Sequence, residues 1–258
     1  MKILLTNDDG IHSEGLKEIS RSLEKFGKII VIAPDRERSG VGHSSSFYKT
    51  ISCRKMWSKK ASRGYALSGT PVDCILIGLE ELCAHEKPDI IVSGVNEGLN
   101  LGQDIFYSGT VGAAIEGGFH NIFSIAISID KNEGSPVYSS AIKTIEKIFK
   151  TMPVDFNKNP HVLNINVPNV EYRDIKGIRL TKLAQIFHQK TIKKIYQAYR
   201  TEYFWIEGNK PEGQLEENSD YWAISNNFIS ITDISMKLGH NKNQYHNDLG
   251  AWIRKLNT

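Results

Sequence analysis

Two short apolar runs flank one amphipathic segment at the start of the chain, and this order restricts the fold more than any other feature. Residues 2–6 and 28–33 are apolar runs with the length of buried strands. Between them, residues 13–26 carry apolar side chains at helical spacing, and Gly27 follows as a stop signal. Strand, helix and strand in this order form a βαβ unit, which requires a parallel sheet with a right-handed crossover.

The same alternation continues along most of the chain. Further buried strands are predicted at residues 90–93, 123–129 and 161–167, helices at 70–84, 110–117 and 138–149, and short antiparallel strands within 47–67. This order predicts an α/β fold. We expect a Rossmann-like, doubly wound, mostly parallel sheet as the core domain, formed by residues 1–170.

The composition changes after residue 170. Residues 171–258 are rich in Lys, Asn, Tyr and Ile, with strand-like alternation near 193–205 and 228–232 and a weak helical pattern at the end. We interpret this part as a β-rich C-terminal extension. Such extensions often pack against a second subunit, so the extension is predicted to be an oligomerisation arm.

Charge and hydropathy argue against several classes of partner. The net charge is +3, from 32 basic and 29 acidic residues, which is too even for the electrostatic footprint of a nucleic-acid-binding protein. Apolar runs are too short to span a bilayer, and the N-terminus reaches carboxylates too early for a secretory signal. We therefore expect a cytoplasmic protein with no membrane and no nucleic-acid partner.

Two adjacent carboxylates follow the first predicted strand. In parallel sheets, ligands bind beyond the carboxyl ends of the strands, where Asp8 and Asp9 would meet Ser39 and Asn96 from the next two strands. Two like charges in a confined site need a cation, and these oxygen ligands suit Mg²⁺, Mn²⁺ or Ca²⁺. The alternative is structural: Asp8 and Asp9 cap the following helix and form a turn with Gly10.

A second group of residues has the pattern of an anion site. Ser108, Gly109 and Thr110 open a small-residue helix, whose free N–H groups and dipole would attract a phosphate. Asn96 would contact a further phosphate oxygen. The alternative is ordinary helix capping by Ser108 or Thr110.

The polar loop after the second strand supplies further candidate substrate contacts. Gly40, His43 and Ser44 lie in this loop, close in sequence to Ser39. They either contact the substrate or belong to a solvated loop, and both interpretations stay open.

The metal and anion patterns together predict hydrolysis of a phosphomonoester. Asp8 or Asp9 would be the catalytic group that orients or deprotonates the attacking water. A route through an aspartyl-phosphate stays open. Signatures of zinc proteases, P-loop enzymes, NAD-binding enzymes and serine hydrolases are lacking from the sequence. A non-catalytic nucleotide-binding regulatory module is the alternative function, but such a module has no need for two carboxylates beside its phosphate.

Four segments resemble the SurE family of survival proteins, the metal-dependent 5′-nucleotidases. They are LLTNDDG (residues 4–10), APDRERSG (33–40), LSGTPVDC (67–74) and PDIIVSGVNEGLNLGQDIFYSGTVGAA (88–114). A weaker likeness covers residues 220–224 and 228–232, after which Asp233 stands where the family usually has Pro.

This resemblance has direct implications for the site. It implies that Asp8, Asp9, Ser39 and Asn96 bind one divalent metal ion per subunit, Mg²⁺ or Mn²⁺, with Ca²⁺ able to occupy the site. It implies hydrolysis of nucleoside 5′-monophosphates, with short-chain polyphosphate as a further substrate. It also implies a homodimer or homotetramer that assembles through the C-terminal arm.

Overall fold

The N-terminal βαβ unit forms as predicted. In the computed structural model, β1 (Lys2–Thr6) and β2 (Lys28–Pro34) pair in parallel, and α1 (Glu14–Leu23) connects them. Ser13 caps α1, because its hydroxyl oxygen accepts a hydrogen bond from the backbone N–H of Leu16. This cap fixes where the loop after β1 ends and the helix begins.

The remaining elements lie in the described parts of the chain, which are residues 1–56, 63–131, 135–153, 156, 161–185, 190–198, 201–208, 215–234 and 245–257. The further strands are β3 (Cys53–Met56), β4 (Arg63–Leu67), β5 (Ile90–Glu97), β6 (Phe123–Ile129), β7 (Val162–Val167), β8 (Ile178–Leu180), β9 (Lys190–Ala198), β10 (Thr201–Gly208) and β11 (Ile229–Asp233). The further helices are α2 (Pro71–Ile77), η1 (Gly78–Leu82), η2 (Gly102–Phe106), α3 (Gly109–Phe119), α4 (Tyr138–Thr151), η4 (Tyr172–Asp174), α5 (Asp220–Ser225) and α6 (Tyr245–Leu256).

The main sheet has nine strands in the order β3-β4-β2-β1-β5-β6-β7-β11-β8. The six strands from β4 to β7 pair in parallel. Numbered by their sequence order, these six strands run 3-2-1-4-5-6, which is the order of the Rossmann fold. Among the described strands of this sheet, the antiparallel pairs lie toward its edges, between β3 and β4 and between β7 and β11. The predicted mostly parallel α/β fold is therefore confirmed.

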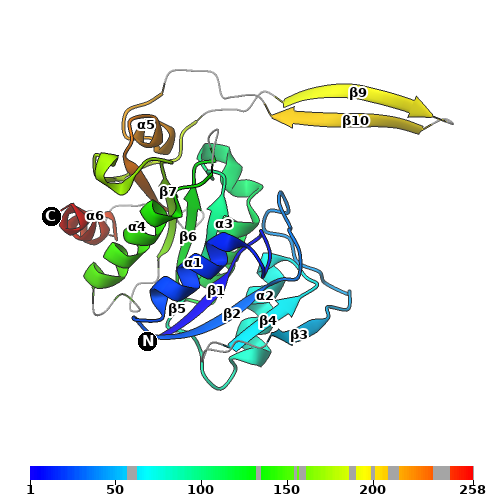
Figure 1. Cartoon of the computed structure of the whole chain (residues 1–258), viewed down its shortest axis with the longest axis horizontal. Coiled ribbons are helices and arrows are strands. Elements are labelled where there is room, and N and C mark those ends of the chain that lie inside the picture. Colours follow the sequence, from blue (N-terminus) through cyan, green and yellow to red (C-terminus); the bar gives the residue numbers. More distant parts are fainter. Residues whose placement is uncertain are drawn as a thin grey trace.

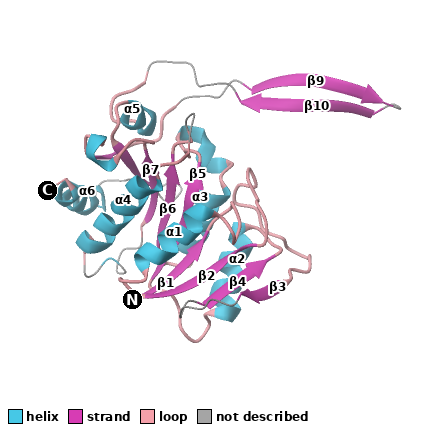
Figure 2. Ribbon diagram, in the orientation of Figure 1, coloured by secondary structure: helices cyan, strands magenta, loops and turns pink. Residues whose placement is uncertain are grey.

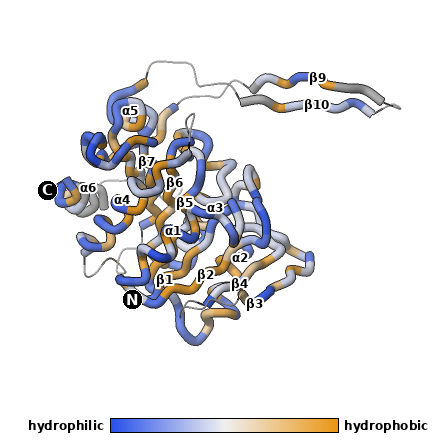
Figure 3. Tube along the Cα trace, viewed as in Figure 1, coloured by the Kyte–Doolittle hydropathy of each residue, from blue (hydrophilic) through white to orange (hydrophobic). Residues whose placement is uncertain are grey.

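Helices cover both faces of the sheet, as the doubly wound prediction requires. Helices α1 and α4 pack together on one face, in front of the sheet in Figure 1, while α2 and α3 pack together on the other. Figure 2 shows the strands of the sheet fanning out between these helices. Hydrophobic residues are concentrated along the central strands, and polar residues occupy the outer turns (Figure 3).

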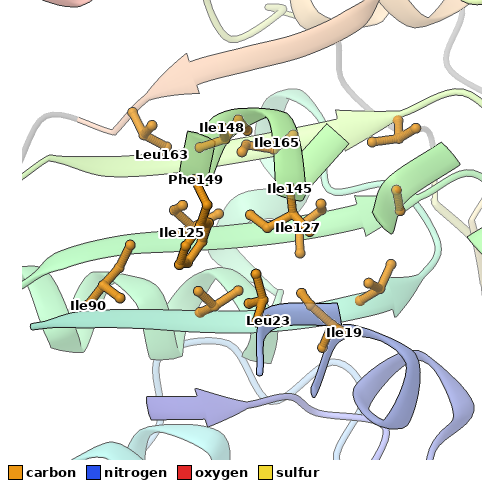
Figure 4. Close-up of a cluster of buried hydrophobic side chains, with 14 of the residues drawn as sticks. Ile19, Leu23, Ile90, Ile125, Ile127, Ile145, Ile148, Phe149, Leu163 and Ile165 are labelled. Atoms are coloured by element: carbon orange, nitrogen blue, oxygen red, sulfur yellow. The ribbon is translucent and has the colours of Figure 1, made fainter. Parts of the chain in front are cut away.

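The largest buried cluster joins α1 and α4 to the middle of the sheet. Ile145, Ile148 and Phe149 of α4 lie over Ile125 and Ile127 of β6 (Figure 4). All five side chains are at most 7% exposed. This apolar layer holds the central strands in place, and their carboxyl ends carry the candidate site.

Residues beyond 170 take part in the same sheet. Strand β11 pairs antiparallel with β7, and β8 pairs parallel with β11. The predicted division at residue 170 therefore falls inside one sheet, because strand pairing continues past it. The remaining ribbon, β9 with β10, forms its own two-stranded sheet and extends away from the body (Figure 1).

Several element boundaries differ from the sequence-based expectation. The helix predicted over 70–84 is α-helical only to Ile77 and continues as the π-helical turn η1. Strand β5 runs to Glu97, so Asn96 lies within a strand and not in a loop. The antiparallel strands expected within 47–67 are β3 and β4, while residues 57–62 of that stretch lie outside the described part.

Among the described residues, none of the helices combines the length and the hydropathy that crossing a bilayer would require.

Close packing of α3 on the sheet predicts a stability effect. A Cβ at Gly117 would overlap the Oγ of Ser124 and lie 2.6 Å from the Cδ1 of Ile91. We expect Gly117→Ala to lower the free energy of unfolding by about 1–3 kcal/mol, because the helix must move off the sheet. Urea unfolding followed by circular dichroism measures this.

The control is the same substitution in a helix with space. A Cβ at Gly250 in α6 would meet nothing closer than the Nη1 of Arg254, at 3.5 Å. Gly250→Ala should be neutral or should stabilise the protein by up to about 1 kcal/mol, since alanine favours a helix. Equal effects of the two substitutions would contradict the packing argument.

Candidate metal and phosphate site

The loops that follow three parallel strands meet at one edge of the sheet. The strand order reverses at β1, which has β2 on one side and β5 on the other, and ligands of such sheets bind at this reversal. The backbone N–H of Arg38, after β2, donates to the carbonyl of Asp8 at 2.7 Å. The backbone N–H of Glu97, at the end of β5, donates to the carboxylate of Asp9. The structure thus brings the predicted loops together.

Asn7 folds the loop that carries the two carboxylates. Its side-chain nitrogen donates to the carbonyl of Gly10 at 3.1 Å and to the Oγ of Ser13 at 2.7 Å, and its Oδ1 accepts the N–H of Gly10 at 3.2 Å. Gly10 has a φ of 96°, which favours glycine. Because Ser13 caps α1, the alternative in which Asp8 or Asp9 caps this helix is wrong.

Asp8 is buried against the start of α3. Only 4% of the residue is exposed, and the hydroxyl of Thr110 donates a hydrogen bond to its Oδ1. A Cβ at Gly109 would lie 2.9 Å from the Cβ of Asp8, so only glycine allows this approach. Burial raises the pKa of the Asp8 carboxyl, while the hydrogen bonds from Thr110 and from the N–H of Gly109 lower it. The helix N-terminus thus faces a carboxylate.

Asp9 has the more perturbed carboxyl group. Burial, followed by the charges of Asp8, Glu97 and Glu37, raises the pKa of Asp9 to about 7. Its Oδ2 is buried and has no hydrogen-bond partner among the described residues. A cation beside the two carboxylates would offset their repulsion and satisfy this oxygen. The residues present therefore fit a hard divalent cation.

The other two predicted metal ligands, Asn96 and Ser39, lie at the same edge of the sheet and differ in their hydrogen bonds. The side-chain nitrogen of Asn96 donates to the carbonyl of Gly98 at 2.7 Å, so this bond leaves the amide oxygen available as a ligand. Ser39 is exposed, and its hydroxyl donates to Glu37 at 2.7 Å. In the described part of the chain, His, Cys, Asp and Glu side chains form no metal-binding group of three. A metal here would thus depend on the neutral oxygens of Ser and Asn.

The predicted anion turn forms the N-terminus of α3, and its hydroxyls are engaged. The Oγ of Ser108 accepts the N–H of Val111 at 3.1 Å, so the capping interpretation holds for Ser108. The hydroxyl of Thr110 bonds to Asp8 instead of standing free. Contact of Ser108, Gly109 and Thr110 with a phosphate stays a prediction, and the helix N-terminus beside the carboxylates supplies the N–H groups for it.

The loop of Gly40, His43 and Ser44 runs along α3 and the start of α2. A Cβ at Gly40 would meet nothing within 4 Å, whereas the Nε2 of His43 lies 2.8 Å from the Oε2 of Glu116. Glu116 is about two helical turns beyond the anion turn. The carbonyl of Ser44 accepts the hydroxyl of Thr70 at 2.7 Å. The ring of His43 is thus directed along the helix, and substrate contact by these three residues stays a prediction.

Two residues at the site did not emerge from the sequence reasoning as part of the chemistry. Glu97 donates its N–H to Asp9 and binds Tyr138 and Lys131 through its side chain, the latter at 3.2 Å. Asn7 shapes the carboxylate loop. Both are direct chain neighbours of predicted ligands, and this adjacency was the only available signal.

Comparisons with known proteins agree with this geometry. The family described as "Survival protein SurE" matches residues 3–190. A protein of Thermoanaerobacter sp. (strain X514) named 5′-nucleotidase SurE is 38% identical over 262 residues, covering 99% of this chain and 100% of the relative. The 5′-nucleotidase SurE of Aquifex aeolicus (strain VF5) is 36% identical over 239 residues, covering 93% of this chain and 94% of the relative.

A solved structure extends the likeness to three dimensions. The crystal structure of the SurE protein from Aquifex aeolicus superposes with a TM-score of 0.78 at 33% identity, and the match covers 98% of this chain and 100% of that chain. Sequence, fold and site geometry together lead to one conclusion: the chain belongs to the SurE family.

Proposed function

We propose that this protein is a metal-dependent 5′-nucleotidase that hydrolyses nucleoside 5′-monophosphates to nucleoside and phosphate, with short-chain polyphosphate as a further substrate. One observation carries the proposal. The buried carboxylate of Asp8, with Asp9 next to it in the chain, lies at the N-terminus of α3, where a helix offers N–H groups to an anion. A phosphate bound at this turn would lie beside two carboxylates, and a cation between these negative groups would offset their repulsion. The names of the relatives support the same activity.

Asp8, Asp9, Ser39 and Asn96 would hold one divalent cation per subunit, Mg²⁺ or Mn²⁺, and Ca²⁺ would also fit these oxygens. When bound, the cation would supply charge stabilisation for the phosphoryl group and would acidify a bound water. The sequence leaves the choice among these metals open, since all three take oxygen ligands.

The two carboxylates differ in what they are free to do. Asp8 is fixed by Thr110 and by the N-terminus of α3, which suits a ligand that must not move. Asp9 has a buried oxygen without a hydrogen-bond partner among the described residues, which suits the group that orients water and accepts its proton. As the water oxygen bonds to phosphorus, Asp9 takes a proton from the water and the bond from phosphorus to the ribose oxygen breaks. The leaving oxygen then takes up the proton that Asp9 holds. Ser108, Gly109 and Thr110 would orient the phosphate.

The β9–β10 ribbon, called the arm from here on, supports a proposal about how copies of the chain assemble. Its large exposed apolar side chains lie on both faces of the ribbon and are 51–66% exposed: Ile192, Ile195, Tyr203, Phe204, Trp205 and Ile206. An isolated two-stranded ribbon is marginally stable in water, and apolar surface of this kind is commonly covered by a partner. We propose that a second copy of the chain covers it, giving a homodimer or homotetramer.

The activity is tested by phosphate release from AMP with and without Mn²⁺ or Mg²⁺. We expect release only with metal, and we expect Asp9→Asn to lower kcat by about 100-fold or more, because the proton acceptor is lost. A protein that releases no phosphate with either metal is not a nucleotidase of this kind. Nucleotide binding without turnover would favour the regulatory alternative.

The carboxylate cluster predicts an unusual pH dependence for the metal-free protein. The pKa of Asp9 rises from 3.8 to about 7, so the folded state holds its proton longer than the unfolded state does. The contribution of Asp9 to stability is therefore present at acid pH and is lost as the pH rises through about 7.

Comparison with Asp9→Asn isolates the contribution of Asp9 to the free energy of unfolding. Relative to the wild type, the variant should gain about 1–2 kcal/mol of stability between pH 5 and pH 8, a figure discounted for partial screening by solvent. Chelator-treated protein unfolded in urea at each pH gives the measurement. If the free energies of unfolding of variant and wild type differed by the same amount across this pH range, the electrostatic account would be contradicted. Saturating Mn²⁺ should abolish the contribution of Asp9 to the pH dependence of wild-type stability.

The assembly is tested by light scattering after size exclusion. Ile192 and Ile206 pair across the ribbon, so Ile192→Glu with Ile206→Glu places two charges in the proposed interface. We expect this double variant to be monomeric and Ala84→Glu, at an exposed apolar position on the body, to assemble like the wild type. A wild-type chain that is itself monomeric at micromolar concentration would reject the proposal.

A further inference from the structure

A buried carboxylate far from the metal loop makes contacts that helix capping does not explain. Asp220, the first residue of α5, is 0% exposed. Its Oδ2 accepts the backbone N–H of Gly102 at 2.7 Å, and its Oδ1 accepts the N–H of Ala184 at 2.9 Å and of Tyr221 at 2.8 Å. Only the bond to Tyr221 belongs to the helix that Asp220 begins. The other two bonds join segments distant in sequence.

The bond to Gly102 leads directly to the anion turn. Gly102 is the first residue of η2, and the carbonyl of Asp104 in η2 accepts the N–H of Ser108 at 3.0 Å. Ser108 then caps α3. The carboxylate of Asp220 is therefore linked through one short, hydrogen-bonded helical turn to the residues proposed to bind phosphate.

The bond to Ala184 joins Asp220 to the segment that precedes β9. We call residues 182–184 and 218–220 the base of the arm. The N–H of Lys182 donates to the carbonyl of Asn218 at 3.1 Å, and the N–H of Asp220 donates to the carbonyl of Lys182 at 2.9 Å. These bonds join the two segments that lead to β9 and come from β10, beside α5 (Figure 1). Gly102 has a φ of 51°, and a Cβ there would lie 2.9 Å from the carbonyl oxygen of Ala184. The loop and the arm base are thus packed without spare room.

The loop that leads from Asn96 to Gly102 is anchored separately at its Asn96 end. The N–H of Asn100 donates to Asn166 at 2.8 Å, its side-chain nitrogen donates to Ser128 at 2.8 Å, and its carbonyl accepts the side chain of Asn164 at 2.7 Å. These three partners are on β6 and β7 in the core sheet. The segment from Asn96 to Asn100 is therefore held by the sheet, and the segment from Gly102 onward is held by Asp220.

We propose that Asp220 is a positioning residue for the phosphate-binding turn, and that it couples this turn to the base of the β9–β10 arm. The proposal rests on the proposed nucleotidase function. Asp220 is fully buried, so it would act on the site indirectly. It sets the position of η2, and through η2 it sets the position of Ser108 and the N-terminus of α3 relative to Asp8 and Asp9.

The test is the kinetics of Asp220→Asn in the full chain with saturating Mn²⁺ and AMP. Asparagine keeps the size of the side chain but places an N–H₂ donor against backbone N–H groups. We expect KM to rise about 10-fold with kcat changed less than about threefold, since the turn binds the phosphate similarly before and during reaction. The Mn²⁺ concentration for half-maximal activity should change less than KM does, because Asn7 folds the loop of Asp8 and Asp9 and Asn100 holds the segment of Asn96.

A second variant breaks the same contact from the other side. In Gly102→Ala the new Cβ would press on the carbonyl of Ala184, and Asp220 is unchanged, so the same rise in KM is expected. If Asp220→Asn fails to fold, Gly102→Ala decides the matter. Asp233→Asn is the matched control: this carboxylate also lies beyond residue 170 and bonds to His161 at 3.1 Å, at the opposite edge of the sheet. It should leave KM unchanged.

The outcomes separate this inference from the proposed function. A lower melting temperature with unchanged KM in the folded variants would make Asp220 merely structural and overturn the proposal. An equal rise in KM in Asp233→Asn would also overturn the proposal. A wild-type chain that does not hydrolyse AMP would reject the nucleotidase function instead. Calorimetry with inorganic phosphate and Mn²⁺ would then decide: about 10-fold weaker binding in Asp220→Asn supports the positioning role, and equal binding overturns it.

Discussion

The carboxylate of Asp8 against the N-terminus of α3 is the contact on which the site depends. It joins Asp8, which lies just after the first strand, to Thr110 in the first turn of α3, 102 residues later in the chain. The contact requires a glycine at position 109, a hydroxyl at position 110 and a loop folded back by Asn7. Each of these local features has little reason to occur alone, and together they place a buried negative group where a helix dipole stabilises it.

Once Asp8 is fixed in this way, the charge of Asp9 is the part of the site that still needs an explanation. Burial raises the pKa of its carboxyl, and the charges of Asp8, Glu97 and Glu37 raise it further. A fold optimised only for stability would not retain such a group. Its retention is understandable if a cation compensates the charge in the working enzyme, so the destabilised carboxylate and the proposed function have the same cause.

The C-terminal residues contribute more than an appendage. Strands β8 and β11 complete the main sheet, and Asp220 reaches back to the loop that carries the anion turn. The arm itself lies outside the body, but its base is hydrogen-bonded to Asp220, which also binds that loop. The proposed assembly through the arm and the proposed phosphate site therefore share a structural element.

The sequence by itself determined the parallel α/β core, since the period of its apolar residues identifies strands and helices locally. It also identified Asp8, Asp9, Ser39 and Asn96 as candidate ligands, because strand ends of a parallel sheet meet at one edge. Only the tertiary structure decided that Thr110 bonds to Asp8 and that His43 is directed toward Glu116. The same holds for Asp220 and Gly102, which are 118 residues apart. Periodicity reports which side of an element is buried, whereas the partner of a buried polar group depends on segments that meet only in the folded chain.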